Sequence, residues 1–241
     1  MFVRIPVITT QQMKEVDHLT VEKFGIQLLQ MMENAGRNLA ELSRRLLKNA
    51  ILEKHVIVAV GKGNNGGGGM VAARHLYNWG ARVTVLLESE ELSGTPAIQW
   101  TILNKLLIEK KTGEAALQCL SSTKADLVID ALIGYGLSGK PRGLTARMIE
   151  KINALSVPVI SLDVPSGLDA TTGEIHDLCI RATATMTLAL PKTGLVKPEA
   201  RNVVGALYLA DISVPDVVYR EMGLRINPIF THDTLIRIEE A

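Results

Sequence analysis

The sequence has few cysteines, few aromatic residues and no excess of charge of either sign. Its 241 residues include two cysteines, Cys119 and Cys179, which are too few for a disulfide framework and lack metal-ligand spacing. We expect both to be small buried apolar side chains. The formal net charge is +1 and aromatic residues make up 4% of the chain. The basic stripe that nucleic-acid binding requires is therefore not expected.

Long apolar runs are also lacking. No run approaches the roughly 18 residues that cross a bilayer, and residues 1–13 lack the basic and apolar regions of a secretory signal. We therefore expect a cytoplasmic protein that does not bind membranes. The remaining composition, 47% hydrophobic and 21% charged, is that of a globular protein. We predict one domain over residues 1–241, with a helical extension (1–50) packed on an α/β core (51–241).

The periodicity of apolar residues predicts the fold class. From Thr9 to Ala50 the spacing is helical and indicates two helices broken near Gly25. After Lys54, apolar runs alternate with helical segments, which predicts a three-layer α/β/α Rossmann-like sandwich with a mostly parallel sheet. The loop 191–205 suggests an antiparallel, hairpin-like edge. The predicted strands are 55–60, 82–87, 126–132, 158–164, 183–190 and 206–212, and the predicted helices are 70–79, 95–108, 114–121 and 144–155.

Glycine is concentrated in one place, because six of the 20 glycines lie between Gly61 and Gly69. We expect a long loop after the first strand, with free N–H groups suited to phosphate and a helix beginning only at Met70. Gly61, Gly63 and Gly66 fit the pattern G-x-G-x-x-G, and Glu88 follows at the distance of a ribose-binding acid. This keeps an NAD(P)-dependent oxidoreductase open, although no Tyr-x-x-x-Lys or comparable hydride-transfer set is present.

Two acids follow apolar runs at the ends of predicted strands, where ligands bind in open α/β sheets. Asp130 and Asp163 are expected at that edge, buried enough for a tuned pKa and exposed enough to reach a substrate. Either could instead order the next turn. Ser166 lacks a histidine partner, which favours a ligand role over a nucleophilic one. Lys192 ends another strand and is expected either to meet a substrate phosphate or to be solvated.

Four motifs occur in a defined order: Met32–Gly36, Gly61–Gly67 followed by Val71–Leu76, Asp130–Gly134 with Gly136 and Leu137, and Asp163–Asp169. With these motifs the sequence resembles the YjeF N-terminal domain family, the NAD(P)HX epimerases, over nearly its whole length. The resemblance implies interconversion of the R and S forms of hydrated NADH or NADPH. In these damaged cofactors, C6 of the nicotinamide ring carries a hydroxyl group. The implied role is repair of nicotinamide cofactors.

The same resemblance implies roles for individual residues. Asp163 would be the catalytic residue at the reacting ring, and Asn65, Asp130 and Ser166 would give oxygen ligands to one K⁺ ion. The implied partners are the dinucleotide substrate, a separate ADP- or ATP-dependent dehydratase, and a second copy of the chain in a homodimer. The implied substrate contacts are Asn64, Asn65, Gly66, Gly67, Gly68, Gly134, Tyr135, Gly136, Leu137, Ser138, Gly139, Lys140 and Asp163.

One position departs from the family pattern. The family reads Asn-Asn-Gly-Gly-Asp-Gly, whereas Gly68 stands here in place of the acid. Loss of a charge-assisted hydrogen bond would weaken binding by about 1.5–3 kcal/mol. A non-catalytic nucleotide-binding or scaffold domain of the same fold therefore stays open as a second function.

Overall fold

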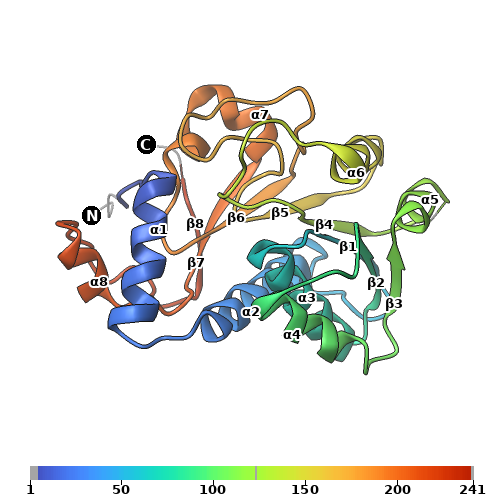
Figure 1. Cartoon of the computed structure of the whole chain (residues 1–241), viewed down its shortest axis with the longest axis horizontal. Coiled ribbons are helices and arrows are strands. Elements are labelled where there is room, and N and C mark those ends of the chain that lie inside the picture. Colours follow the sequence, from blue (N-terminus) through green and yellow to red (C-terminus); the bar gives the residue numbers. More distant parts are fainter. Residues whose placement is uncertain (1–4, 123, 240–241) are drawn as a thin grey trace.

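The computed structural model describes residues 5–122 and 124–239. A sheet forms the middle layer, and helices cover both of its faces (Figure 1). The strands are β1 (His55–Val60), β2 (Arg82–Leu87), β3 (Glu109–Thr112), β4 (Leu127–Ala131), β5 (Val159–Leu162), β6 (Ala184–Leu188), β7 (Ala206–Ala210) and β8 (Leu235–Arg237). The α-helices are α1 (Thr10–His18), α2 (Leu28–Leu46), α3 (Asn64–Asn78), α4 (Gly94–Leu103), α5 (Glu114–Ser122), α6 (Gly143–Asn153), α7 (Arg201–Val204) and α8 (Asp216–Glu221). The π-helical turn η1 (Leu19–Lys23) and the 3₁₀ turns η2 (Thr193–Val196) and η3 (Pro198–Ala200) complete the helical segments.

The strand order is β3-β2-β1-β4-β5-β6-β7-β8, and within the described residues only β8 runs antiparallel to its neighbour. The chain moves outward from β1 to β3, then returns to the other side of β1 with β4. The direction of winding therefore reverses between β1 and β4, and a ligand crevice is expected beyond their carboxyl ends.

Strand β1 shows why the sheet is buried on both faces. All six of its residues are buried. Val56, Val58 and Val60 join the apolar cluster beneath α2, α3 and α4, while Ile57 and Ala59 join the cluster beneath α5 and α6. Side chains alternate between the two faces of a strand, so a continuous apolar run fits a sheet that is covered on both sides.

The N-terminal helices are as the sequence predicts. Thr9 and Gln12 form a capping box at the start of α1, and the chain turns at Gly25, where φ is +71°. Gly36 of α2 lies so close to α3 that a Cβ there would overlap Val71. Cys119 and Cys179 are buried, as predicted, and burial raises the pKa of the Cys179 thiol to about 12.

Two predictions about connections are wrong. Helix α3 begins at Asn64 rather than Met70, so Gly66–Gly69 lie inside the helix instead of in a loop. Strands β6 and β7 are parallel, because η2, η3 and α7 between them form a crossover that the short segment 191–205 did not suggest. Strands β3 and β8 were missed, since both are short edge strands and β3 reads Glu-Lys-Lys-Thr.

Candidate functional site

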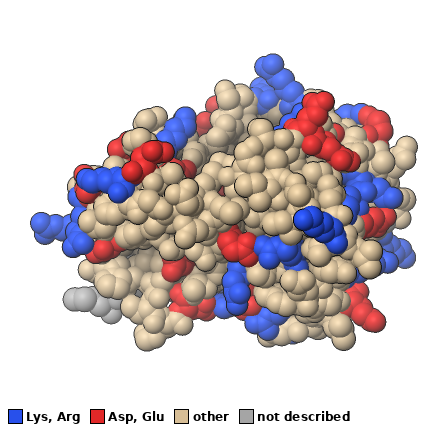
Figure 2. All heavy atoms as spheres, turned by 60° about the horizontal axis from the view of Figure 1, so that its bottom comes forward, with Lys and Arg blue, Asp and Glu red and all other residues tan. Residues whose placement is uncertain are grey.

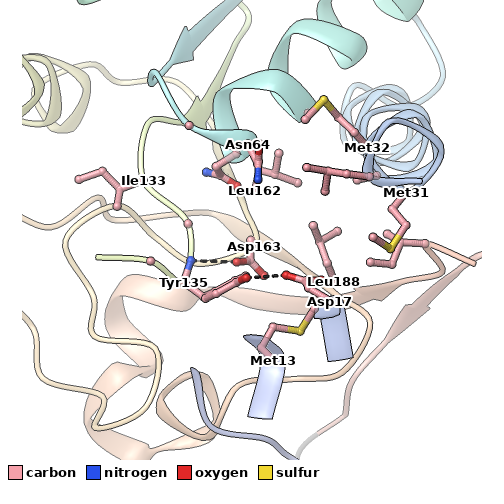
Figure 3. A pocket seen from close by; sticks show the side chains of 18 of the residues that line it. Met13, Asp17, Met31, Met32, Asn64, Ile133, Tyr135, Leu162, Asp163 and Leu188 are labelled. Atoms are coloured by element: carbon pink, nitrogen blue, oxygen red, sulfur yellow. Dashed lines mark hydrogen bonds between the residues drawn. The ribbon is translucent and has the colours of Figure 1, made fainter. Parts of the chain in front are cut away.

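A cavity of about 480 Å³ lies beyond the carboxyl ends of β1, β4, β5 and β6 (Figure 3). One wall comes from α1 and α2 and is largely apolar, while the sheet edge supplies the polar groups. The amino end of α3 borders the same space. The lining residues are Met13, Lys14, Asp17, Leu28, Met31, Met32, Ala35, Gly63, Asn64, Asn65, Gly68, Leu132, Ile133, Gly134, Tyr135, Gly136, Leu162, Asp163, Leu188, Lys192 and Ile212.

Asp163 is held in an unusual backbone conformation. Its φ is +67°, and the N–H of Val164 donates to the carbonyl of Leu162, which closes a three-residue γ-turn around it. The backbone N–H of Tyr135 donates to Asp163 Oδ2 over 3.0 Å, as Figure 3 shows. Strained backbone positions of this kind concentrate at functional sites. Asp163 lines the cavity at the edge of the sheet where the sequence places it, and its role toward a ligand stays a prediction.

Lys192 is not solvated, so that expectation is wrong, whereas a contact with a substrate phosphate stays a prediction because Lys192 lines the cavity. Its side chain is fully buried, and Nζ lies 2.5 Å from Asp163 Oδ1. The same ammonium donates to the Leu188 carbonyl over 2.9 Å. The chain reaches back in this way because a second γ-turn, at Ala189 with φ +62°, directly follows β6.

Tyr135 and Asp17 form a second polar pair in the cavity wall. The Tyr135 hydroxyl donates to Asp17 Oδ2 over 2.5 Å, and its ring lies 5.8 Å from Lys192 Nζ. Burial raises the pKa of Asp17, although the Tyr135 hydrogen bond and the Lys192 charge oppose this. Burial also raises the pKa of Tyr135 well above its ordinary value. Helix α1 thus contributes an acid to a site built mainly from the sheet.

Asp130 does not line the cavity, so the expectation that it reaches a substrate is wrong. It is fully buried behind the cavity, where its carboxylate accepts hydrogen bonds from the hydroxyls of Ser161 (2.8 Å) and Ser166 (2.6 Å). It also accepts from the N–H groups of Ser166 and Leu132. Burial raises the pKa of Asp130, and these hydrogen bonds oppose the increase. The network fixes the loops after β4 and β5 to each other.

Asn65 lies beside that network. Its side-chain Nδ2 is buried and has no hydrogen-bond partner within the described residues. A Cβ on Gly134 would lie 3.1 Å from the Asn65 amide and 3.2 Å from Asp163 Oδ2, so only glycine leaves this space open. Ile133, the preceding residue, donates its N–H to Ser166 Oγ. The structure therefore places the Asn65 side chain beside the loop after β4. Backbone N–H groups of this loop donate hydrogen bonds to Asp130 and Ser166.

Close packing accounts for Gly66, Gly67 and Gly68 of the glycine-rich segment 61–69. Gly68 lines the cavity, and a Cβ there would meet the tip of Leu162 at 2.8 Å. Gly66 and Gly67 do not line it. A Cβ at Gly66 would overlap the carbonyl of Gly61, and one at Gly67 would lie 2.6 Å from the tip of Met32.

A second cleft of about 550 Å³ shares Ile133 and Gly136 with the first. It takes in the predicted contacts Leu137, Ser138 and Lys140, whereas Gly139 borders neither space. Glu88 lies here as well, where the Thr145 hydroxyl donates to it over 3.4 Å. The predicted substrate contacts therefore divide between two spaces that share lining residues, except Gly66, Gly67 and Gly139, which line neither.

Sequence reasoning missed the residues that α1 and α2 add to the site. Asp17 had a usable signal, because it follows Met13 by four residues and so places an acid on the buried face of α1. Leu28 and Met31 read only as part of an apolar helix face. Leu188 and Ile212 follow the ordinary pattern of buried strands and carry no separate signal.

The surface carries both acidic and basic side chains. On the face in Figure 2 they lie interspersed, with no continuous basic stripe. No described helix is long and apolar enough to cross a bilayer.

Comparison with known proteins gives consistent matches. Residues 28–194 match the family described as YjeF-related protein N-terminus. The NAD(P)H-hydrate epimerase of Dehalogenimonas lykanthroporepellens is 42% identical over 225 residues, which span 90% of this chain and 86% of that protein. The protein of the same name from Rhodopirellula baltica is 36% identical over 223 residues, or 92% of this chain and 90% of that protein.

Two further comparisons concern length and fold. The bifunctional NAD(P)H-hydrate repair enzyme Nnr of Moorella thermoacetica is 38% identical over 214 residues, which span 86% of this chain but 40% of that protein. The crystal structure of yeast ynu0 superimposes with a TM-score of 0.85 at 24% identity, covering 97% of this chain and 100% of that one. At this identity the superposition supports the fold alone.

Proposed function

Because the chain belongs to the family of YjeF-related protein N-termini, we infer that it is an NAD(P)H-hydrate epimerase that acts in the repair of nicotinamide cofactors. The relatives that carry this name match most of the chain and most of their own length. The structural observation that supports the inference is the placement of Asp163. This residue lies in a strained turn and lines a cavity beyond the carboxyl ends of the strands.

The chemistry of the substrate explains why one carboxylate is useful. The ring nitrogen of NAD(P)HX can expel the C6 hydroxyl as water, leaving a cationic ring that water can re-enter from either face. We propose that Asp163 moves the proton and that its negative charge stabilises the cation. Apolar side chains such as Met31 and Leu162 line the cavity, and we propose that they exclude water around the bound ring, which strengthens this electrostatic interaction.

We propose that the hydrated nicotinamide occupies the first cavity and that the rest of the dinucleotide extends into the second cleft. The two spaces meet at Ile133 and Gly136, so one elongated ligand can bridge them. Lys140 and Arg142 lie in the second cleft, where cationic side chains suit phosphate groups. Glu88 also lines this cleft, where it could contact a ribose in an epimerase or in an oxidoreductase, so its position does not separate the two interpretations.

The residues around Asn65 fit a K⁺ ion, and we propose that Asn65, Asp130 and Ser166 hold it. These three side chains offer an amide oxygen, a carboxylate and a hydroxyl, so the set consists of oxygen ligands with a single negative charge. Such a set suits a large monovalent cation. The space that Gly134 leaves beside the Asn65 amide supports the proposal, in which Asn65 would present its amide oxygen to the ion. When bound, the ion would balance the buried charge of Asp130 and hold the two loops together.

Potassium is therefore expected to raise thermal stability. With K⁺ at about ten times its Kd, stabilisation should reach about 1.4 kcal/mol, or a Tm increase of roughly 3–6 °C. Differential scanning calorimetry in KCl and in tetramethylammonium chloride at equal ionic strength measures this. Asn65→Ala, which leaves the Ser161 and Ser166 hydrogen bonds to Asp130 in place, should lose the response. Equal melting in both salts, or a full response of the variant, would contradict the assignment.

Gly68→Asp tests the departure from the family pattern. The tip of Leu162 can move to admit a side chain, and the new carboxylate would accept hydrogen bonds from the substrate. We expect KM for NADHX to fall about tenfold or more, in line with 1.5–3 kcal/mol for a charge-assisted hydrogen bond. Gly68→Ala is the matched control, since it displaces Leu162 without adding a charge. A KM for Gly68→Asp no lower than for Gly68→Ala would show that an acid at position 68 does not strengthen substrate binding.

The experiment that tests the proposed function is epimerisation itself. Purified protein should bring pure R and pure S NADHX to the same mixture faster than buffer alone. Binding without acceleration would favour a scaffold domain of the same fold. Hydride transfer to or from the cofactor would favour an oxidoreductase.

The remaining expectations are proposals about context. We propose that the chain forms one domain and works in the cytoplasm beside a separate ADP- or ATP-dependent dehydratase. The bifunctional relatives, which are much longer than the matched region, support this pairing of activities. We also propose a homodimer formed through the N-terminal helices, where Leu29 is an exposed apolar side chain. Sedimentation equilibrium of the purified protein tests the dimer.

A further inference from the structure

Lys192 is a buried charge that the role of Asp163 alone does not explain. Its side chain has no exposed surface, yet Lys192 is among the residues that line the cavity, and its Nζ lies 2.5 Å from Asp163 Oδ1. The backbone around it is fixed, because Ile8 donates to the Pro191 carbonyl and accepts from the N–H of Thr193. A lysine held so firmly against one carboxylate oxygen is placed for proton transfer.

The two oxygens of Asp163 have different partners. Oδ2 accepts the N–H of Tyr135, and Oδ1 accepts Nζ of Lys192. Nζ and Oδ1 form a buried ion pair, in which the transferable proton is on Nζ. A departing hydroxyl needs a proton. The group within direct reach of Oδ1 that can supply it is the ammonium of Lys192.

On the basis of the proposed epimerase function, we propose that Lys192 is the proton-donating partner of Asp163. A proton passes from Nζ to Oδ1, and the carboxylic acid gives it to the C6 hydroxyl of the substrate. The C6–O bond breaks, water leaves, and the electron pair of the ring nitrogen forms the C=N bond of the cation. On return, water adds to C6 and its proton goes to Asp163 and then to Lys192.

The charges explain why such a pair is useful. At rest the ammonium neutralises the carboxylate, and the substrate is uncharged at the ring. After proton transfer the amine is neutral, the carboxylate is unpaired and the ring is positive. The transfer thus frees the negative charge of Asp163 when the cation forms, which is when stabilisation accelerates the reaction. The other ionisable groups facing Lys192 are Asp17 and Tyr135, while Lys14 lines the same cavity.

The test removes the amine and then returns it from solution. We expect Lys192→Ala to lower kcat about 100-fold or more, with a much smaller change in KM. Ethylammonium should restore part of the rate, and across a series of primary amines the restored rate should change with the pKa of the amine. Tetramethylammonium, which has a positive charge but no N–H proton to transfer, should not restore the rate. Thermal melting of the variant, with and without amine, checks that the fold persists.

Three results would overturn the proposal. The first is a kcat for Lys192→Ala within threefold of wild type. The second is equal restoration by tetramethylammonium, which would assign Lys192 a purely electrostatic role. The third is no restoration by any primary amine in a variant that still binds NADHX. Each presupposes an active wild-type chain, so an inactive wild type would count against the epimerase function and not against Lys192 in particular.

Discussion

Replacing Asp163 by Asn is expected to lower kcat for epimerisation about 10²–10⁴-fold, the usual contribution of a positioned acid–base group. Asn has nearly the same shape and also adopts the positive φ that position 163 requires. Its amide oxygen can still accept the Lys192 hydrogen bond. It can neither take up a proton nor carry the charge that a cationic ring needs. The loss should therefore fall on kcat and leave substrate binding largely intact.

Steady-state rates with R-NADHX, together with circular dichroism of the variant, measure this effect. Asp169→Asn is the matched control, because Asp169 belongs to the same motif but is outside the cavity and orders the turn at Thr171 and Thr172. The control should keep nearly full activity. An Asp163→Asn enzyme with a wild-type kcat would remove Asp163 from the mechanism.

Gly66→Ala is expected to cause a large loss of stability, although the residue lies inside a helix. Helix propensity alone predicts a gain of about 1 kcal/mol, because Ala favours a helix over Gly. The structure predicts the opposite sign. A Cβ at Gly66 would overlap the carbonyl of Gly61, which is backbone and cannot move aside as a side chain can. We expect a loss of about 3 kcal/mol, at the upper end for overpacking, or a Tm decrease of roughly 6–12 °C.

Gly63→Ala provides the comparison within the same motif. Gly63 precedes the first residue of α3, and a Cβ there would meet nothing within 4 Å. Its substitution should change stability by less than about 1 kcal/mol. Thermal melting of both variants measures the difference. If Gly66→Ala is as stable as Gly63→Ala, the close approach of α3 to the chain after β1 does not explain why position 66 is glycine.

The sequence predicted the central sheet because its strands are buried on both faces and read as continuous apolar runs. It failed at α3, since glycine within a helix is indistinguishable from glycine in a loop until its packing neighbours are known. Gly66 packs against the backbone of Gly61, and Gly69 packs against the side chain of Ala131. Both contacts exist only in the folded protein. The edge strands show no clear pattern, because β8 has only three residues and β3 reads Glu-Lys-Lys-Thr.

The candidate site was predictable where it depends on strand ends and not where it depends on long-range contacts. The position of Asp163 follows from the alternation of strands and helices. The burial of Asp130 does not, because it depends on the loop of Ser166 folding over it. Lys192 meets Asp163 only because two γ-turns follow neighbouring strands. Asp17 reaches the site from a helix 118 residues before Tyr135.

The central claim is that the cavity beside Asp163 releases and returns the C6 hydroxyl of NAD(P)HX as water. The most direct measurement is epimerisation of R-NADHX by the purified chain in K⁺ buffer made with heavy-oxygen water, followed by mass spectrometry of the separated epimers. We predict conversion well above the spontaneous rate, with solvent oxygen in the S epimer and no oxidation or reduction of the cofactor. A rate equal to that of buffer alone, or an S epimer that retains its original oxygen, would contradict the account.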